Sequence, residues 1–409
     1  MTPKAIERAV ARALATLDPR ARVHDALPKA PPGGLPAKVL AIGKAAPAMA
    51  EGALDRWGDR IASTLVIAPR GTDAKALAKR RDVTVLRAAH PVPDESSVRA
   101  AEAALDFVHT NYERHAILVL ISGGASALVC KPIVSLEAKQ IVTRALLASG
   151  AAIQDINVVR KHLSRIKGGG LVKAAYPNRV HTLVMSDVIN GTPTMIGSGP
   201  SVVDPTQARD ARRIVRKWAP AVGNVRLADT LRPSDRRAGF ATAEIVVSPE
   251  DLASAVADAL RPDVFRVKVL PSSQEDAASL AKEYASIVAR PRDGDHVLAY
   301  VRAAEPAVTV AKKKGRGGRS THTAALVARA LAGTSHAFTF AAIATDGVDG
   351  ASGTAGAIVT QAFAKRVGAE AIDRAVASFE TGALHRDAGT ALAEGPTGQN
   401  LADLHVLVV

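Results

Sequence analysis

The chain has 409 residues, too many for one ordinary hydrophobic core, so we expect two domains. Apolar residues make up 47% and charged residues 22%, as in globular proteins, while the 3% aromatic content argues against a protein that stacks single-stranded bases. The formal net charge of +14 is compatible with nucleic-acid binding, with steering of an anionic substrate, or with an arginine-rich surface that has no function. Basic runs at residues 79–81, 212–217 and 312–319 fall in no nucleic-acid motif, which argues against a nucleic-acid partner.

The chain contains one cysteine, Cys130, so it can form neither a disulfide framework nor a multi-cysteine zinc site by itself. Residues 1–17 show the pattern of an amphipathic helix rather than of a signal peptide. No stretch reaches about 18 uninterrupted apolar residues, so we expect no membrane span. The expected compartment is the cytoplasm.

Short apolar runs alternate with helical patterns along the chain, which predicts an α/β fold with mostly parallel sheets. In the N-terminal half the expected strands are residues 39–42, 64–68, 83–86, 116–121 and 180–185. The expected helices there are residues 98–109, 136–149 and 153–164, followed by a basic helix that ends near residue 217.

The stretch 220–239 combines prolines, glycines and charges, and we place the domain boundary there. The predicted domains are residues 1–235 and 236–409. The second series has expected strands near residues 244–247, 266–270, 297–301, 339–344 and 404–409. Its expected helices lie near residues 252–260, 276–289, 322–331 and 355–367.

Ligands of open parallel sheets bind beyond the carboxyl ends of the strands, and Lys44 lies at such an end. A lysine beside a helix N-terminus is electrostatically unfavourable, so we expect Lys44 to serve a bound anion rather than the fold. A surface lysine that extends its charge into water is the alternative.

The second candidate is the turn Ser122-Gly123-Gly124-Ala125-Ser126 after a buried strand. Its glycines permit a sharp turn, and its N–H groups with the next helix terminus form a potential anion site. The turn lacks the Gly-Lys-Ser/Thr of a P-loop and the Gly-x-Ser-x-Gly of a nucleophile elbow. A tight structural turn is the alternative.

The third candidate is Asp187, which follows the strand 180–185 and could bind Mg²⁺ or cap a helix or turn. Just upstream lies a basic, glycine-rich segment whose charges and glycines suit phosphates, although a solvated helix face is equally compatible. The candidate phosphate-binding residues of this segment are Arg160, Lys161, Lys167, Gly168 and Gly169.

The fourth candidate is the pair Asp346 and Asp349, which follows the strand 339–344. Two carboxylates at a strand end suggest a metal site or a general base. A glycine turn whose aspartates bond their own backbone is the alternative. The basic, glycine-rich run 312–319 is either an anion clamp or a solvated loop.

Taken together, these segments resemble the two-domain glycerate 2-kinases that carry a C-terminal MOFRL-type domain. The order and spacing of the matches extend over nearly the whole chain. The matching segments are residues 43–46, 90–94, 122–127, 157–170, 186–188, 197–200, 317–319, 345–350 and 395–400.

The resemblance implies two Rossmann-like domains with an active-site cleft between them. It implies ATP-dependent phosphorylation of D-glycerate at the 2-hydroxyl to give 2-phosphoglycerate, with Mg²⁺. Lys44 and Arg319 match basic site residues of the family, and Asp187 and Asp346 match acidic ones. One aspartate would accept the hydroxyl proton and the other would bind the metal. A homodimer remains an open option.

The chain departs from the family pattern at a few positions. Ala125 replaces the third glycine of the turn, and Gly353 replaces an acidic residue. Residues 320–322 read Ser-Thr-His instead of Asn-Gln-Glu, and residues 302–305 read Arg-Ala-Ala-Glu instead of Ser-Gly-Gly-Glu. These departures leave open a kinase for another small hydroxy or sugar acid. Two further alternatives are a polyanion-binding protein and a hydroxypyruvate reductase, although the chain lacks the Gly-x-Gly-x-x-Gly fingerprint of nicotinamide enzymes.

Overall fold

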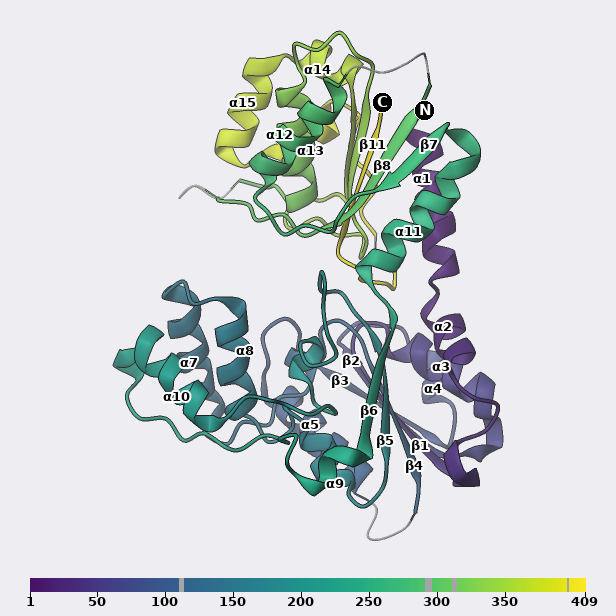
Figure 1. Ribbon diagram of the computed structural model, residues 1–409, viewed down its shortest axis with the longest axis vertical. Helices are drawn as coiled ribbons and strands as arrows, with labels where there is room; N and C mark the ends of the chain where they lie inside the picture. Colours follow the sequence, from purple (N-terminus) through teal and green to yellow (C-terminus); the bar gives the residue numbers. More distant parts are fainter. Residues whose placement is uncertain (110–113, 291–295, 311–314, 396) are drawn as a thin grey trace. The chain divides into compact units, whose positions relative to one another are not determined.

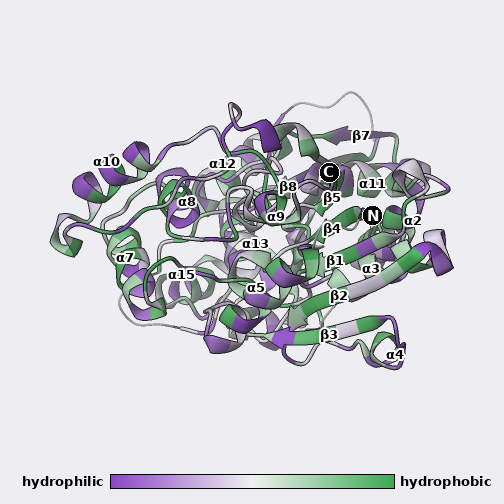
Figure 2. Cartoon of the chain, turned by 90° about the horizontal axis from the view of Figure 1, so that it is seen from below, coloured by the Kyte–Doolittle hydropathy of each residue, from purple (hydrophilic) through white to green (hydrophobic). Residues whose placement is uncertain are grey.

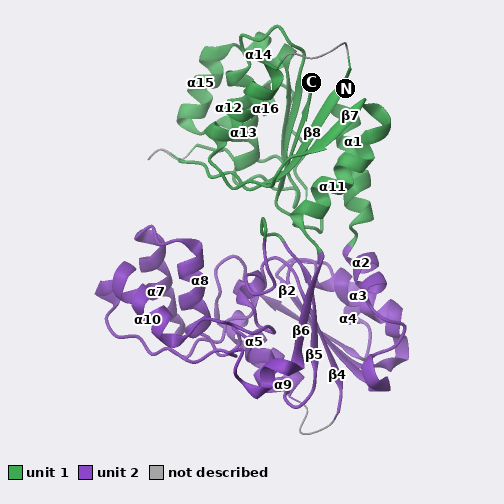
Figure 3. Cartoon of the chain, in the orientation of Figure 1, with its two compact units in different colours: residues 1–18, 187–190, 247–409 green, residues 19–186, 191–246 purple. Residues whose placement is uncertain are grey.

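The computed structural model describes residues 1–109, 114–290, 296–310, 315–395 and 397–409. These residues form two compact units, coloured separately in Figure 3. Unit 1 comprises residues 1–18, 187–190 and 247–409, and unit 2 comprises residues 19–186 and 191–246. Residues 312–314 of the basic run at 312–319 lie outside the described part of the chain.

Unit 2 is built on a six-stranded sheet with the order β3-β2-β1-β4-β5-β6 (Figure 1). The pairs from β3 through β5 are parallel. The order reverses direction between β1 and β4, so the loops after these two strands diverge and leave room for a ligand. The strands are β1 Ala37–Ile42, β2 Ile61–Pro69, β3 Val83–Ala88, β4 Ala116–Ile121, β5 Val180–Met185 and β6 Ala241–Val247.

The central strands of unit 2 are apolar (Figure 2) because helices cover both faces of the sheet. Strand β4 is buried along its whole length. Its main helices are α2 Pro19–Ala26, α3 Ala46–Trp57, α5 Glu95–Val108, α7 Leu136–Ala148, α8 Ile153–His162 and α10 Ala208–Trp218; the short ones are α4 Lys75–Ala78, α6 Ala125–Leu128 and α9 Gly170–Ala175. Helices α7, α8 and α10 share a small core of their own, while the outer face of α10 is strongly hydrophilic (Figure 2).

Unit 1 contains a five-stranded sheet with the order β10-β9-β11-β8-β7. Among the described strands of this sheet, β7 and β8 pair in parallel, whereas β11 is antiparallel to both β8 and β9, and β10 is antiparallel to β9. The prediction of mostly parallel sheets is therefore wrong for this unit. The short connection from β9 to β10 leaves no room for the crossover helix that parallel neighbours need. The strands are β7 Arg266–Val269, β8 Leu298–Ala304, β9 Thr339–Ala344, β10 Gly356–Thr360 and β11 Asp403–Val408.

The helix predicted over residues 355–367 is also wrong in its first half, where the chain forms β10. The run Ile358-Val359-Thr360 is β-branched and favours a strand. Thr360 then begins a new element, because its hydroxyl accepts a hydrogen bond from the N–H of Phe363 at 3.3 Å and caps the next helix. The helices of unit 1 are α1 Pro3–Thr16, α11 Pro249–Leu260, α12 Ala277–Val288, α13 Arg319–Ala330, α14 Gln361–Val367, α15 Ala369–Ser378 and α16 Thr381–Asp387.

The division of the structure differs from the boundary expected after residue 235. Strand β6 joins the sheet of unit 2 beside β5, so unit 2 extends to residue 246. Helix α1 packs on α11, where Arg12 donates a hydrogen bond to the carbonyl of Ala259 at 2.9 Å, so the first residues group with unit 1. Within the described ranges, no helix combines the length and the apolarity that a membrane crossing requires.

Candidate functional site

Two loops of unit 2 meet at the point where the strand order reverses, and both were singled out from the sequence. The N–H of Lys44 donates to the carbonyl of Gly123 at 2.9 Å, and the N–H of Ala45 donates to the hydroxyl of Ser122 at 3.1 Å. Gly43 has a φ of +137°, and a Cβ there would lie 2.1 Å from the Ser122 hydroxyl oxygen. Ser122 is buried, so its hydroxyl oxygen joins the two loops.

Gly124 carries the left-handed conformation of the turn, with a φ of +88°. A Cβ at this position would lie 3.1 Å from His90 Cδ2 and 3.6 Å from Lys44 Cγ, so the three residues are close neighbours. Ala125 begins α6 without a positive φ. The alanine in place of the third glycine therefore introduces no backbone strain.

The turn presents a set of N–H groups. Among the described contacts, the N–H groups of Gly123, Gly124 and Ser126 donate to no protein acceptor, as expected of a backbone anion nest. The helix that follows, α6, has only four residues. The contribution expected from a following helix terminus is therefore small, because a single turn of helix carries little dipole.

A cavity of about 220 Å³ adjoins this turn and is lined by three cationic side chains. Lys139 comes from α7, Arg160 from α8, and Lys167 from the glycine-rich segment; no carboxylate is among the described residues that line the cavity. We call this cavity the cationic pocket. Its other lining residues are His90, Pro91, Pro93, Gly124, Ser126 and Ala127. Lys139 and His90 were not among the site residues chosen from the sequence.

Lys167 is the most buried of these cations, with 4% of its surface exposed. Its ammonium donates to the hydroxyl of Ser126 at 2.7 Å, to the carbonyl of Ser126 at 2.9 Å, and to the carbonyl of Gly197 at 3.4 Å. Lys167 therefore fixes the end of the turn and also places a positive charge at the wall of the pocket.

Burial lowers the pKa of Lys167 to about 7, and the neighbouring charges of Lys139 and Arg160 act in the same direction. Burial also lowers the pKa of Lys139 and of Arg160. The pKa of His90 is lowered by burial and by the charge of Lys44. These groups destabilise one another's charged forms, and an anion in the pocket would relieve that destabilisation.

Lys161, Gly168 and Gly169, which the sequence predicts to bind phosphate, make contacts within the protein. The Lys161 ammonium pairs with Asp204 at 3.1 Å, and the side chain of Asp204 is 1% exposed. The N–H of Gly168 donates to the carbonyl of Ser198 at 3.1 Å, and the N–H of Gly169 donates to the carbonyl of Gly199 at 2.8 Å. These groups support the loop that carries Lys167, and their hydrogen bonds are already made.

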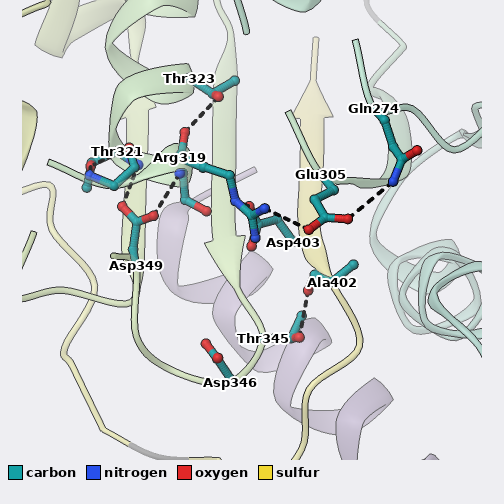
Figure 4. A network of polar contacts seen from close by, with 12 residues as sticks. Gln274, Glu305, Arg319, Thr321, Thr323, Thr345, Asp346, Asp349, Ala402 and Asp403 are labelled. Atoms are coloured by element: carbon teal, nitrogen blue, oxygen red, sulfur yellow. Dashed lines mark hydrogen bonds and ion pairs between the residues drawn. The ribbon is translucent and has the colours of Figure 1, made fainter. Parts of the chain in front are cut away.

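Unit 1 gathers a second set of charged groups at one edge of its sheet. Because β11 runs antiparallel to β8 and β9, its first residue, Asp403, lies opposite Ala304 and Ala344, the last residues of those strands. Arg319, the first residue of α13, donates to Glu305 at 2.8 Å and approaches Asp403 at 3.3 Å (Figure 4). Arg319 therefore bridges two carboxylates.

Asp403 was not predicted as a site residue. It is 4% exposed, and burial raises its pKa to about 7 even though Arg319 acts in the opposite direction. The acidic neighbours Asp349, Glu305 and Asp346 raise the pKa further. The signal available in the sequence was weak: a single aspartate at the start of a largely apolar strand.

Asp346 and Asp349 play different parts in the structure. Asp349 is buried and accepts the N–H groups of Ser320 at 2.9 Å and Thr321 at 2.8 Å, so it caps α13 (Figure 4). One carboxylate oxygen of Asp346 accepts the N–H of Val348 at 3.1 Å. Of the expected carboxylate pair, Asp349 is therefore a structural cap, whereas Asp346 is a carboxylate on the loop after β9.

Asp187 contacts another segment that was singled out from the sequence. The side-chain amide of Asn400 donates to one of its carboxylate oxygens at 3.1 Å. In the described part of the chain, no group of three or more His, Cys, Asp or Glu side chains is arranged to hold a metal ion. A protein site with one or two carboxylates suits Mg²⁺ only when substrate phosphates supply further oxygens.

Two regions of the chain match known families. Residues 5–228 match the family described as a domain of unknown function, DUF4147, and residues 298–403 match the MOFRL family. The chain is therefore a two-part α/β protein in which a DUF4147 region is followed by a MOFRL region. The chain belongs to the glycerate 2-kinase family.

The D-glycerate 2-kinase of Thermotoga maritima is 31% identical over 375 residues, which cover 90% of this chain and 89% of that protein. A protein of Agrobacterium vitis named putative hydroxypyruvate reductase is 33% identical over 410 residues, which cover 97% of this chain and 92% of that protein. The crystal structure of the glycerate kinase from Thermotoga maritima superposes with a TM-score of 0.84 at 28% identity and covers 99% of both chains. A Pyrococcus horikoshii protein structure superposes with a TM-score of 0.77 at 28% identity and covers 100% of this chain and 99% of that one.

Proposed function

We propose that the chain catalyses the ATP-dependent phosphorylation of D-glycerate at its 2-hydroxyl to give 2-phosphoglycerate. The observation that carries the proposal is the cationic pocket at the reversal point of the unit 2 sheet, in a member of the glycerate 2-kinase family. It lies beside a turn whose N–H groups at Gly123, Gly124 and Ser126 have no acceptor among the described residues. Phosphoryl transfer requires positioning and neutralisation of negative charge more than covalent chemistry. This pocket supplies both.

In unit 2, the N–H groups of Gly123, Gly124 and Ser126 hold phosphate or carboxylate oxygens of the reactants. Lys44, Arg160 and Lys167 neutralise their charge, together with Lys139. Ser122 contributes by fixing the turn to the Lys44 loop. The preorganised donors need no rearrangement as negative charge develops in the transition state.

In unit 1, Asp187 or Asp346 accepts the proton of the 2-hydroxyl, and the other aspartate would help to hold Mg²⁺. Bound Mg²⁺ would neutralise phosphate charge. The deprotonated 2-oxygen forms a bond to the γ-phosphorus, and the bond between that phosphorus and the leaving oxygen of ADP breaks. Arg319 neutralises charge on the reactants, and Glu305 with Asp403 holds its guanidinium in place.

The test is a coupled assay of ADP release with D-glycerate, followed by ³¹P NMR of the product. A phosphate on C2 couples to one proton and gives a doublet, whereas a phosphate on C3 couples to two protons and gives a triplet. We expect the doublet. Absence of ADP release with D-glycerate, or a triplet product, would overturn the proposal.

The same assay extended to other small hydroxy and sugar acids tests the departures at residues 320–322 and 353. Consumption of NADH with hydroxypyruvate in the absence of ATP would favour the activity named for the Agrobacterium vitis relative. The loop after β1, Gly43-Lys44-Ala45-Ala46, lacks the glycine fingerprint of a nicotinamide site. Since ATP is a cytoplasmic substrate, we place the reaction in the cytoplasm.

A further inference from the structure

Unit 2 contains another cavity, with a volume of about 760 Å³, which is lined by the first residues of β4 and β5. Figure 1 shows where these two strands lie in the sheet. We call it the strand-start cavity. The candidate phosphate turn follows the opposite end of β4, and a six-residue strand spans about 20 Å. The volume falls within the range of small-molecule sites, about 300–1,000 Å³. The proposed phosphoryl transfer does not use this cavity.

One part of the cavity wall is apolar and held in place by specific contacts. Trp57, at the end of α3, donates its ring N–H to the carbonyl of Pro28 at 3.0 Å and is 5% exposed. Phe240 packs edge-on against Tyr176, with ring centroids 5.0 Å apart and an interplanar angle of 76°. Ile117 of β4 also lines the cavity. Two fixed aromatic rings and an aliphatic side chain suit the apolar body of a ligand.

The polar part of the wall carries positive charge. The guanidinium of Arg179 lies 5.5 Å from the centre of the Phe240 ring and donates to the carbonyl of Gly239 at 3.3 Å. Arg114 also lines the cavity, and no carboxylate side chain is among the described lining residues. Two guanidiniums beside an apolar wall favour a ligand with an anionic head group.

A buried ring nitrogen lies in the same wall. His115 is 9% exposed, and its backbone N–H donates to the side-chain oxygen of Asn178 at 3.1 Å. Its Nδ1 atom has no hydrogen-bond partner among the described residues. This atom is shielded from solvent, so we assign it no part in ligand binding.

We propose that the strand-start cavity binds a small amphipathic organic anion. Its apolar body lies against Trp57, Ile117 and Phe240, and its anionic head pairs with Arg114 and Arg179. A ligand there contacts the first residues of β4, whose last residue leads into the candidate phosphate turn. The cavity is therefore a ligand site separate from the proposed reaction.

The test uses Trp57 as a fluorescent reporter. The chain has two tryptophans, and Trp218→Phe removes the one on α10, which does not line the cavity. The probe is 8-anilinonaphthalene-1-sulfonate, an aromatic anion. We expect saturable energy transfer from Trp57 to one bound probe, and weaker binding of the neutral anilinonaphthalene that lacks the sulfonate. Inorganic sulfate should not displace the probe.

Two variants test the charged and the apolar parts of the wall. Arg179→Glu should weaken probe binding at least tenfold, whereas Arg209→Glu, the same charge change on the exposed face of α10, should leave it within about twofold. Phe240→Ala should also weaken binding about tenfold, with the folded state of each variant checked by its thermal transition. Absence of energy transfer from Trp57, or equal effects of the two arginine variants, would overturn the proposal. The fluorescence signal is independent of kinase activity, so failure of the proposed reaction is measured separately.

Discussion

Binding of an anion to the cationic pocket should be coupled to uptake of a proton by Lys167. With a pKa of about 7, the Lys167 amine is protonated in about one molecule in ten at pH 8. An opposite charge within a few ångströms raises a pKa by about 1–3 units. A rise of about two units would leave about nine molecules in ten protonated, so binding at pH 8 should take up about 0.8 proton. At pH 6 the amine is already protonated, and the uptake by Lys167 should fall to about 0.1 proton.

The uptake is measured by isothermal titration calorimetry in buffers that differ in ionisation enthalpy. The slope of the observed binding enthalpy against the buffer ionisation enthalpy gives the number of protons. D-glycerate and ATP are titrated separately, which shows which reactant places its charge in the pocket. Lys167→Met removes the titrating amine at similar length and separates its contribution from that of His90. Uptake that is absent at pH 8 for both reactants, or unchanged in Lys167→Met, would refute the reasoning.

The same pKa predicts how folding stability varies with pH. The unfolded lysine has a pKa of about 10.4, so between pH 7 and that value the unfolded chain binds more protons than the folded chain. The contribution of Lys167 to the free energy of unfolding should therefore rise with pH across this window, by up to about 1.4 kcal/mol per pH unit. Denaturant titrations at several pH values should show a flatter dependence for Lys167→Met.

Three further predictions follow from the loops and from the unit 1 cluster. Lys44→Ala should lower kcat/KM for D-glycerate about 10²–10³-fold, whereas the exposed control Lys79→Ala should leave it unchanged. Asp403 should lower the free energy of unfolding increasingly as pH rises from about 4 to about 7, since its pKa in the folded state lies above its unfolded value. In denaturant titrations, Asp403→Asn should remove this loss of stability. An unaltered pH dependence in Asp403→Asn would contradict the raised pKa of Asp403. Gly124→Ala should lower the free energy of unfolding by about 1–2 kcal/mol, because a φ of +88° is unfavourable for alanine. Equal thermal transitions for wild type and Gly124→Ala would be inconsistent with this account. Ala125→Gly, by contrast, should change turnover less than twofold.

The sequence determined the elements whose signals are local. The continuous apolar run at residues 116–121 and the largely apolar run at 180–185 match β4 and β5 at the predicted bounds, because a strand covered on both faces is mostly apolar. The turn after β4 could also be predicted from its glycines, since Gly124 adopts a positive φ that other residues avoid. By contrast, residues 355–367 were misassigned, because a short apolar run carries little information that separates a strand from a helix.

The tertiary structure decided which charged groups share a site. Lys139, Arg160 and Lys167 come from separate elements and converge only when α7 and α8 pack beside the turn. The same packing commits the N–H groups of Gly168 and Gly169 to protein carbonyls, although their sequence resembles a phosphate loop.

In unit 1, antiparallel pairing brings Asp403 beside Arg319, 84 positions earlier in the chain. The sequence by itself determined most of the strands and turns and the chemical type of the residues at their ends, because these depend on local backbone preferences and burial patterns. Strand order, strand direction and the pairing of charges depend on contacts between distant segments, and only the tertiary structure decided them.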